Sequence, residues 1–137
     1  MSALSKSART AVWHCALVKR GEKVLVIVDA PKREIGYALL EAAREVSSEA
    51  VLVEIAPGRF HGEEPPPEIA SLMREFDVIF APTSRSLSHT KARREASKSG
   101  VRIATLPDIW RETFFRALNA DYKGIARRSR KLAEIIS

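Results

Sequence analysis

The sequence has few of the residues that build metal and redox centres. Cysteine occurs once, at Cys15, and histidine occurs at His14, His61 and His89 only. A single cysteine excludes an internal disulfide and every motif that needs two thiols. The histidines form no H-E-x-x-H pair, so the zinc-peptidase helix motif is absent from the chain.

Long apolar runs are missing as well. The longest is Val24–Val28, whereas a membrane-spanning helix needs about 20 apolar residues. The first ten residues contain no apolar stretch of signal-peptide length. We therefore expect a cytoplasmic protein that has no membrane partner.

The composition is that of one folded domain with an uneven positive charge. Hydrophobic residues make up 45% of the 137 residues and charged residues 29%, with a formal net charge of +6. This length and balance predict a single domain over residues 1–137. Cations gather in residues 85–102 and 123–131, as on nucleic-acid-binding surfaces, but no recognised binding motif accompanies them. Nucleic-acid binding is therefore not expected.

Apolar patterning alternates between strand and helix along the chain. Short runs rich in β-branched residues predict buried strands, and each is followed by a segment with helical periodicity. Strands are predicted at 23–29, 50–56, 77–82 and 101–107, and helices at 4–19, 31–46, 68–75, 88–97, 108–118 and 121–136. We predict a three-layer α/β/α sandwich, Rossmann- or flavodoxin-like, with a mostly parallel four-stranded sheet.

The candidate binding site follows the third predicted strand. Ligands of such sheets bind beyond the carboxyl ends of the strands, where strand order reverses. The loops at these ends are 29–31, 57–67, 82–89 and 106–108, and the third is the most polar. We predict that Asp29, or the turn around it, satisfies the first amides of the helix after the first strand. Ser88 is the predicted cap of the helix after the third strand, with Ser86 as the alternative. The free amides at the second cap can seat a carboxylate or phosphate. The ligand-binding candidates are Thr83, Ser84, Arg85, Ser86, Ser88, His89, Thr90 and Lys91.

A plain helix cap with solvated neighbours is the alternative interpretation of these hydroxyls. For His89 we favour a functional or interdomain role, because the sequence suggests no packing role. His61 lies beside Glu63 and Glu64 in an acidic loop, and we favour a solvated loop over the alternative of a metal site formed by these three residues. Glycine-rich phosphate loops and the G-x-S-x-G elbow are absent. We therefore predict no catalytic residue, no metal ligand and no cofactor in this chain.

Large apolar residues also lie off the predicted core faces. At 100° per residue, Trp13 and Leu17 point away from the inner face of the first helix, and Phe115 points away from that of the fifth. The helix 88–97 offers only Ala92 and Ala96 as apolar contacts. These features predict an interface with another chain or a further domain.

Much of the chain resembles a known family. Residues 21–46, 61–107 and 119–135 are similar to the N-terminal region of the thermophilic metallo-aminopeptidases of the aminopeptidase T, or leucyl aminopeptidase-like, type. The most specific part is "PTSRSLSHTKARREA" followed by "RIATLP". The resemblance implies an N-terminal α/β domain, followed in the family by a larger domain that carries a two-metal peptidase centre, in a dimeric enzyme.

The resemblance implies a related domain without the catalytic half. None of the family's metal ligands has a matching position here, so we carry over no metal or catalytic residue; the divalent metal belongs to the family's C-terminal domain. We expect the chain to act in substrate-end contacts, domain packing or dimerisation, as a fragment or a free-standing copy. The alternative is a stand-alone binding module for a small anionic ligand or an acidic partner, seated between the first and third strand ends.

Overall fold

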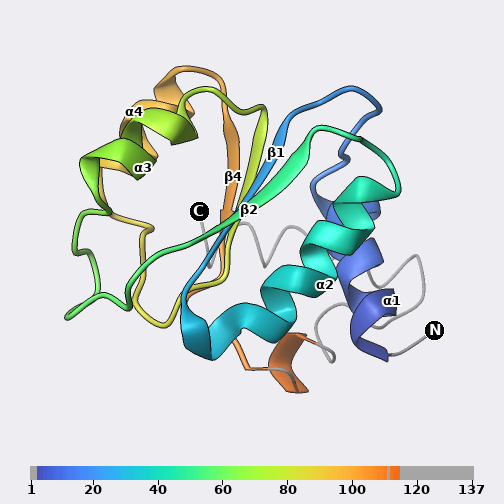
Figure 1. Ribbon diagram of the computed structural model, residues 1–137, viewed down its shortest axis with the longest axis horizontal. Helices are drawn as coiled ribbons and strands as arrows, with labels where there is room; N and C mark the ends of the chain where they lie inside the picture. The colour runs from blue at the N-terminus through green and yellow to red at the C-terminus, as the bar shows by residue number, and fades with distance from the viewer. Residues whose placement is uncertain (1–2, 111, 115–137) are drawn as a thin grey trace.

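The structure is a computed structural model that describes residues 3–110 and 112–114. A sheet lies between two layers of helices (Figure 1). Along the chain the elements are α1 (Ala3–Arg9), a π-helical segment (Thr10–Cys15), β1 (Val24–Val28), a 3-10 turn (Ala30–Lys32), α2 (Arg33–Arg44), β2 (Ala50–Glu54), α3 (Pro67–Met73), β3 (Val78–Ala81), α4 (Lys91–Lys98) and β4 (Arg102–Thr105).

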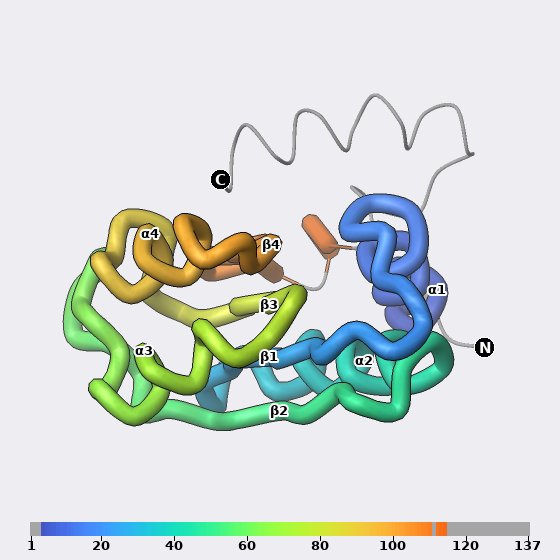
Figure 2. The backbone as a smooth tube through the Cα atoms, turned by 90° about the horizontal axis from the view of Figure 1, so that it is seen from above, coloured from blue at the N-terminus to red at the C-terminus, as the bar shows by residue number. Residues whose placement is uncertain are grey.

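The sheet is parallel and doubly wound. Its four strands follow the order β2-β1-β3-β4, and each neighbouring pair is parallel. Helices α1 and α2 cover one face, and α3 and α4 cover the other (Figure 2). The strand order reverses between β1 and β3, so the switch point lies at their carboxyl ends. The predicted three-layer α/β/α architecture is confirmed.

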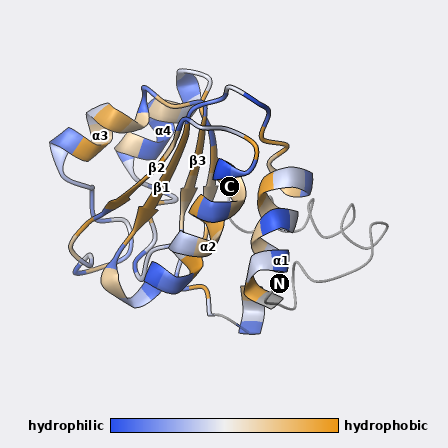
Figure 3. Cartoon of the chain, turned by 45° about the vertical axis from the view of Figure 1, so that its right-hand side comes forward, coloured by the Kyte–Doolittle hydropathy of each residue, from blue (hydrophilic) through white to orange (hydrophobic). Residues whose placement is uncertain are grey.

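Two apolar clusters form the core, one on each face of the sheet. Val24, Val26 and Val28 of β1 pack with α1 and α2, whereas Leu25 and Ile27 pack with α3 and α4. The strands carry the hydrophobic colour along most of their length (Figure 3). All of β1 is buried, as predicted for an inner strand of a parallel sheet.

Strand β2 departs from the prediction of a buried strand. It lies at the edge of the sheet, and Val51 is 41% exposed. An edge strand lacks a neighbour on one side, so part of its apolar surface stays open to solvent. The apolar run alone does not distinguish an edge strand from an inner one.

The first helix is shorter and wider than predicted. It is α-helical only to Arg9 and then π-helical to Cys15, instead of continuing to Lys19. The i to i+5 bonding of a π-helix changes the angle between successive residues, so Trp13 turns inward and its indole N–H donates to the carbonyl of Ala42 at 3.3 Å. The prediction that Trp13 points outward is therefore wrong. Leu17 is 61% exposed, as predicted.

Helix α4 begins three residues later than predicted. Thr90, not Ser88, is its N-cap, and the Thr90 hydroxyl accepts from the amide of Arg93 at 3.1 Å. The narrow apolar face formed by Ala92 and Ala96 is buried, at 4% and 0% exposure, against the sheet. Within the described residues, this face is therefore covered by the protein's own core.

The chain after β4 also differs from its predicted start. Asp108 has a φ of 47° and is not helical, so no helix begins there. Its amide donates to the carbonyl of Thr83 at 2.7 Å. Residues 112–114 are helical. Phe115 and the predicted helix 121–136 lie outside the described residues. In the described part of the chain, no helix has the length and apolar character that crossing a membrane requires.

Candidate functional site

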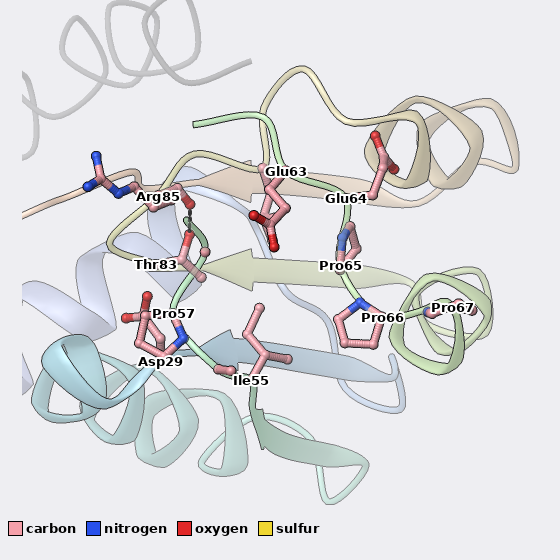
Figure 4. A pocket seen from close by; sticks show the side chains of 13 residues that line it. Asp29, Ile55, Pro57, Glu63, Glu64, Pro65, Pro66, Pro67, Thr83 and Arg85 are labelled. Atoms are coloured by element: carbon pink, nitrogen blue, oxygen red, sulfur yellow. Dashed lines mark hydrogen bonds between the residues drawn. The ribbon is translucent and has the colours of Figure 1, made fainter. Parts of the chain in front are cut away.

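A pocket of about 320 Å³ lies at the carboxyl ends of β1, β2 and β3 (Figure 4). Asp29 lines it from the end of β1, and residues 55–58 from the end of β2. Residues 63–67 belong to the loop before α3, while Thr83, Arg85 and Leu87 follow β3. Three of the predicted edge loops therefore form one pocket beside the switch point. The fourth loop, 106–108, does not line it.

Asp29 is the most deeply buried polar group of the pocket lining. Its side chain is 1% exposed, and Oδ2 accepts from the amide of Ser84 at 2.8 Å. Asp29 is the N-cap residue of the 3-10 turn that follows it, and its backbone carbonyl accepts from the amide of Lys32 at 3.0 Å. Its side chain makes no cap hydrogen bond; the carboxyl group is bonded across the sheet edge instead. Its second oxygen, Oδ1, has no hydrogen-bond partner among the described residues, which is unfavourable for a buried polar atom.

Hydrogen bonds to the segment after β3 hold the loop 57–67 over the edge of the sheet. The amide of Gly62 donates to the carbonyl of Ser86 at 2.9 Å, and the amide of Ser86 donates to Nδ1 of His61 at 2.9 Å. The carboxylate of Glu64 accepts from the amides of Lys91 and Ala92 at 2.8 and 3.1 Å. This loop therefore forms the outer wall of the pocket.

Glu64 occupies the position that the sequence predicts for a ligand anion. The amides of Lys91 and Ala92 are the free amides at the start of α4, and the chain's own carboxylate binds them. Sequence reasoning missed this role because Glu64 lies in a different loop, and an acid in a polar loop is only a weak local signal. His61 bonds Ser86, and no group of three His, Cys, Asp or Glu residues suited to a metal occurs in the described residues.

Most of the predicted ligand hydroxyls are used to hold the polar loop itself. The Thr83 hydroxyl donates to the carbonyl of Arg85 at 2.6 Å, and the Ser88 and Thr105 hydroxyls lie 2.6 Å apart. The Thr90 hydroxyl donates to the carbonyl of Leu87 at 2.8 Å. These threonines and Ser88 are buried, so their hydroxyl groups stabilise the fold.

The remaining candidates are distributed around the loop. The Ser86 hydroxyl accepts from the amide of Ser88 at 3.0 Å, and Arg85, His89 and Lys91 are exposed. Among the predicted ligand candidates, Thr83 and Arg85 line the pocket. The Arg85 guanidinium extends away from Asp29 and Glu63 (Figure 4).

The pocket combines carboxyl groups with an apolar wall. Glu63 accepts from the amide and from Nε of Arg59, both at 3.1 Å, and the amide followed by the guanidinium lowers the pKa of Glu63. Glu63 is therefore held as a carboxylate. Asp29, Glu63 and Glu64 supply the acidic lining, and the apolar wall consists of Ile55, Pro57, Pro65, Pro66, Pro67 and Leu87.

A buried lysine joins the end of β1 to the chain after β4. Lys32 is 5% exposed, and its Nζ lies 3.3 Å from Oδ1 of Asp108 and 4.2 Å from the ring centroid of Trp110. Burial of an ammonium is tolerated because it is paired and covered by an aromatic face. This contact holds the fourth edge loop against the switch point.

The cations of the basic stretch are partly bonded within the fold. Arg93 Nε donates to the carbonyl of Ser88 at 2.9 Å, and Arg94 donates to the carbonyl of His89 at 2.9 Å. Arg102 forms an ion pair with Glu22 at 2.8 Å. These cations serve local structure, and their geometry adds no support for a nucleic-acid surface.

Together the fold and the site describe a doubly wound α/β domain with a small pocket beside its switch point. No model of a known protein family matches the chain, and no curated protein matches it. It is similar to the solved structure of 2,5-dihydroxypyridine dioxygenase from Pseudomonas putida KT2440, with a TM-score of 0.64 and 15% sequence identity over 78% of this chain and 35% of that chain. At this identity the similarity shows a shared fold, and this chain spans about a third of the length of that protein.

Proposed function

We propose that this chain is a ligand-binding α/β domain related to the N-terminal domain of aminopeptidase T-type metallopeptidases. In this proposal it contributes contacts to a substrate or other small ligand rather than the metal centre. The observation that carries the proposal is the pocket beside the switch point, lined by the buried carboxyl group of Asp29. The resemblance over residues 21–46 and 61–107 supports the family relationship.

The lining favours binding over catalysis by this domain. The described residues of the pocket wall include carboxyl groups, one guanidinium and one threonine hydroxyl, and that hydroxyl donates to the carbonyl of Arg85. Nucleophilic catalysis needs a nucleophile paired with a base, and no such pair lies among these lining residues. Recognition of a ligand requires only the cavity and its polar groups.

The proposal includes a partner and a location. We infer a homo-oligomer or a following catalytic domain, and a cytoplasmic protein. The resemblance to a family of dimeric two-domain enzymes supports an interface. The alternative of an anion-binding module loses its main support, because Glu64 fills the amide site at the start of α4.

A pocket-filling variant tests the binding role. Ala56 lines the pocket and is exposed, so Ala56→Leu should reduce the cavity with little effect on folding. We expect a thermal-shift screen of small amines, alcohols, carboxylates and phosphates to reveal saturable stabilisation of the native chain. The stabilisation should disappear in Ala56→Leu.

The matched control is Ser71→Leu, which adds the same side chain at an exposed position of α3 outside the pocket lining. It should keep the native response. A native chain that no compound class stabilises, or a shift that persists in Ala56→Leu, would refute the pocket as a binding site.

A further inference from the structure

We propose that the pocket recognises a small organic amine, whose ammonium group binds Asp29 while its apolar body lies against the proline-rich wall. The inference rests on the proposed function, because it assigns a ligand class to the same pocket. It is carried by the unpartnered oxygen of Asp29, the charges of the lining and the shape of the apolar wall.

The first argument is the hydrogen-bonding state of Asp29. Its side chain is 1% exposed, and only Oδ2 has a donor, the amide of Ser84. Oδ1 has none among the described residues, although Asp29 lines the pocket. A carboxylate held out of water is stabilised most by a charged donor. An ammonium group that enters the pocket and reaches Asp29 would supply one.

The second argument is the sign of the charge around the pocket. Asp29, Glu63 and Glu64 all contribute carboxyl groups to the lining, and hydrogen bonds from Arg59 lower the pKa of Glu63. The Arg85 guanidinium extends away from Asp29 and Glu63 (Figure 4). A ligand carboxylate or phosphate would meet like charges here, whereas an ammonium gains attraction that a neutral alcohol lacks.

The third argument is the remaining surface of the pocket. Ile55, Leu87 and the prolines at positions 57 and 65–67 form an apolar wall beside the carboxyl groups. The volume of about 320 Å³ lies at the lower end of the range for small-molecule sites. The ligand is therefore a compact amine with a short apolar body.

Three probes of matched shape test the assignment: isoamylamine, isoamyl alcohol and isovalerate, each titrated into the full chain by calorimetry. We expect isoamylamine to bind about tenfold or more tightly than either isostere. Its affinity should fall as salt is added, because part of the attraction is between charges. Binding of the alcohol should show no comparable salt dependence.

Asp29→Asn provides the sharpest variant. An asparagine can still accept from the Ser84 amide while its NH2 group replaces the unpartnered oxygen, so the amine preference should be lost. Circular dichroism establishes whether this variant folds. If it does not, Glu63→Gln at the pocket rim is the second variant, and it should weaken amine binding about twofold while leaving alcohol binding unchanged.

The outcomes separate the two proposals. Equal binding of the three probes, or tighter binding of isovalerate, would overturn the amine assignment and leave the pocket as a binding site. Failure of every probe to bind would overturn the amine assignment, and the broader thermal-shift screen then decides whether the pocket binds any ligand. An amine preference that survives in a folded Asp29→Asn variant would also overturn the assignment. Where Asp29→Asn does not fold, an isoamylamine affinity that is unchanged in Glu63→Gln would overturn it.

Discussion

The carboxylate of Glu64 accepts hydrogen bonds from the amides of the first two residues of α4, Lys91 and Ala92. The first amides of a helix have no partner within the helix, and a negative charge at this end interacts favourably with the helix dipole. Glu64 therefore stabilises α4 and also fixes the loop that walls the pocket.

Glu64→Ala should lower the free energy of unfolding by about 1 kcal/mol, because two amides lose their acceptor. Urea denaturation measures the change. Glu63→Ala is the control: Glu63 bonds the exposed Arg59, so its loss should cost less. Equal effects of the two substitutions would show that the contact of Glu64 with α4 adds no stability.

At the residue scale the sequence predicts which loop is polar but not what each polar group binds. Thr90, Ser88 and Ser86 are chemically interchangeable as caps, and the sequence favoured Ser88. Tertiary contacts decide between them, because the Ser88 hydroxyl is bonded to Thr105 on β4. The roles of Asp29 and Glu64 depend in the same way on partners 55 and 27 residues distant, which no local pattern encodes.

Among the elements, α2 and β1 make an unusually close contact at Gly36. A Cβ atom built at Gly36 would lie 2.1 Å from Cγ1 of Val28, a residue that is 0% exposed in the middle layer. No pair of carbon atoms approaches that closely without a bond. The helix therefore sits at this distance from the sheet because position 36 has no side chain.

Gly36→Ala should destabilise the protein by about 1–3 kcal/mol, since overpacking outweighs the better helix propensity of alanine. Denaturant melts of Gly36→Ala, Val28→Ala and the double variant test the cause. Removing the Val28 methyl groups makes room for the new one, so the double variant should be more stable than the sum of the single effects predicts. Strict additivity of the two single effects would show that the strain does not come from the contact between positions 36 and 28.

The positions of the elements were largely predictable from the sequence, whereas their irregularities were not. The apolar runs at Val24–Val28 and residues 78–81 predict strands from composition alone. The observed strands fall inside the predicted ranges. The π-helical segment Thr10–Cys15 and the exposed side of β2 were missed. Both depend on packing against other elements, which neither a 100° periodicity nor a count of neighbouring apolar residues can predict.

At the scale of the whole molecule, an ion pair joins the segment before β1 to the start of β4. The Arg102 guanidinium donates to both carboxylate oxygens of Glu22, at 2.9 and 2.8 Å. These bonds, with a smaller contribution from the amide of Lys19, lower the pKa of Glu22 from 4.5 to about 2. The pair ties an inner strand of the sheet to an edge strand.

This pair predicts an acid-dependent loss of stability. Above the ordinary pKa of 4.5 Glu22 is charged in both states, and the pair contributes fully; as the pH falls toward about 2 the unfolded chain binds the proton first. The native chain should therefore be more stable than Glu22→Gln at neutral pH, with the difference shrinking below the ordinary pKa of 4.5 and lost as the pH falls through about 2. Urea melts across this range measure it, and a pH-independent difference would contradict it.

The contact between Lys32 and Trp110 also provides an intrinsic fluorescent probe of this part of the protein. The chain has two tryptophans: Trp13 is bonded within the helical layer of α1 and α2, and Trp110 stacks over an ammonium beside the switch point while remaining 62% exposed. Trp13→Phe would leave a single indole at the carboxyl edge of the sheet. Its emission would then follow events at this edge separately from the packing of the helices, without an added label.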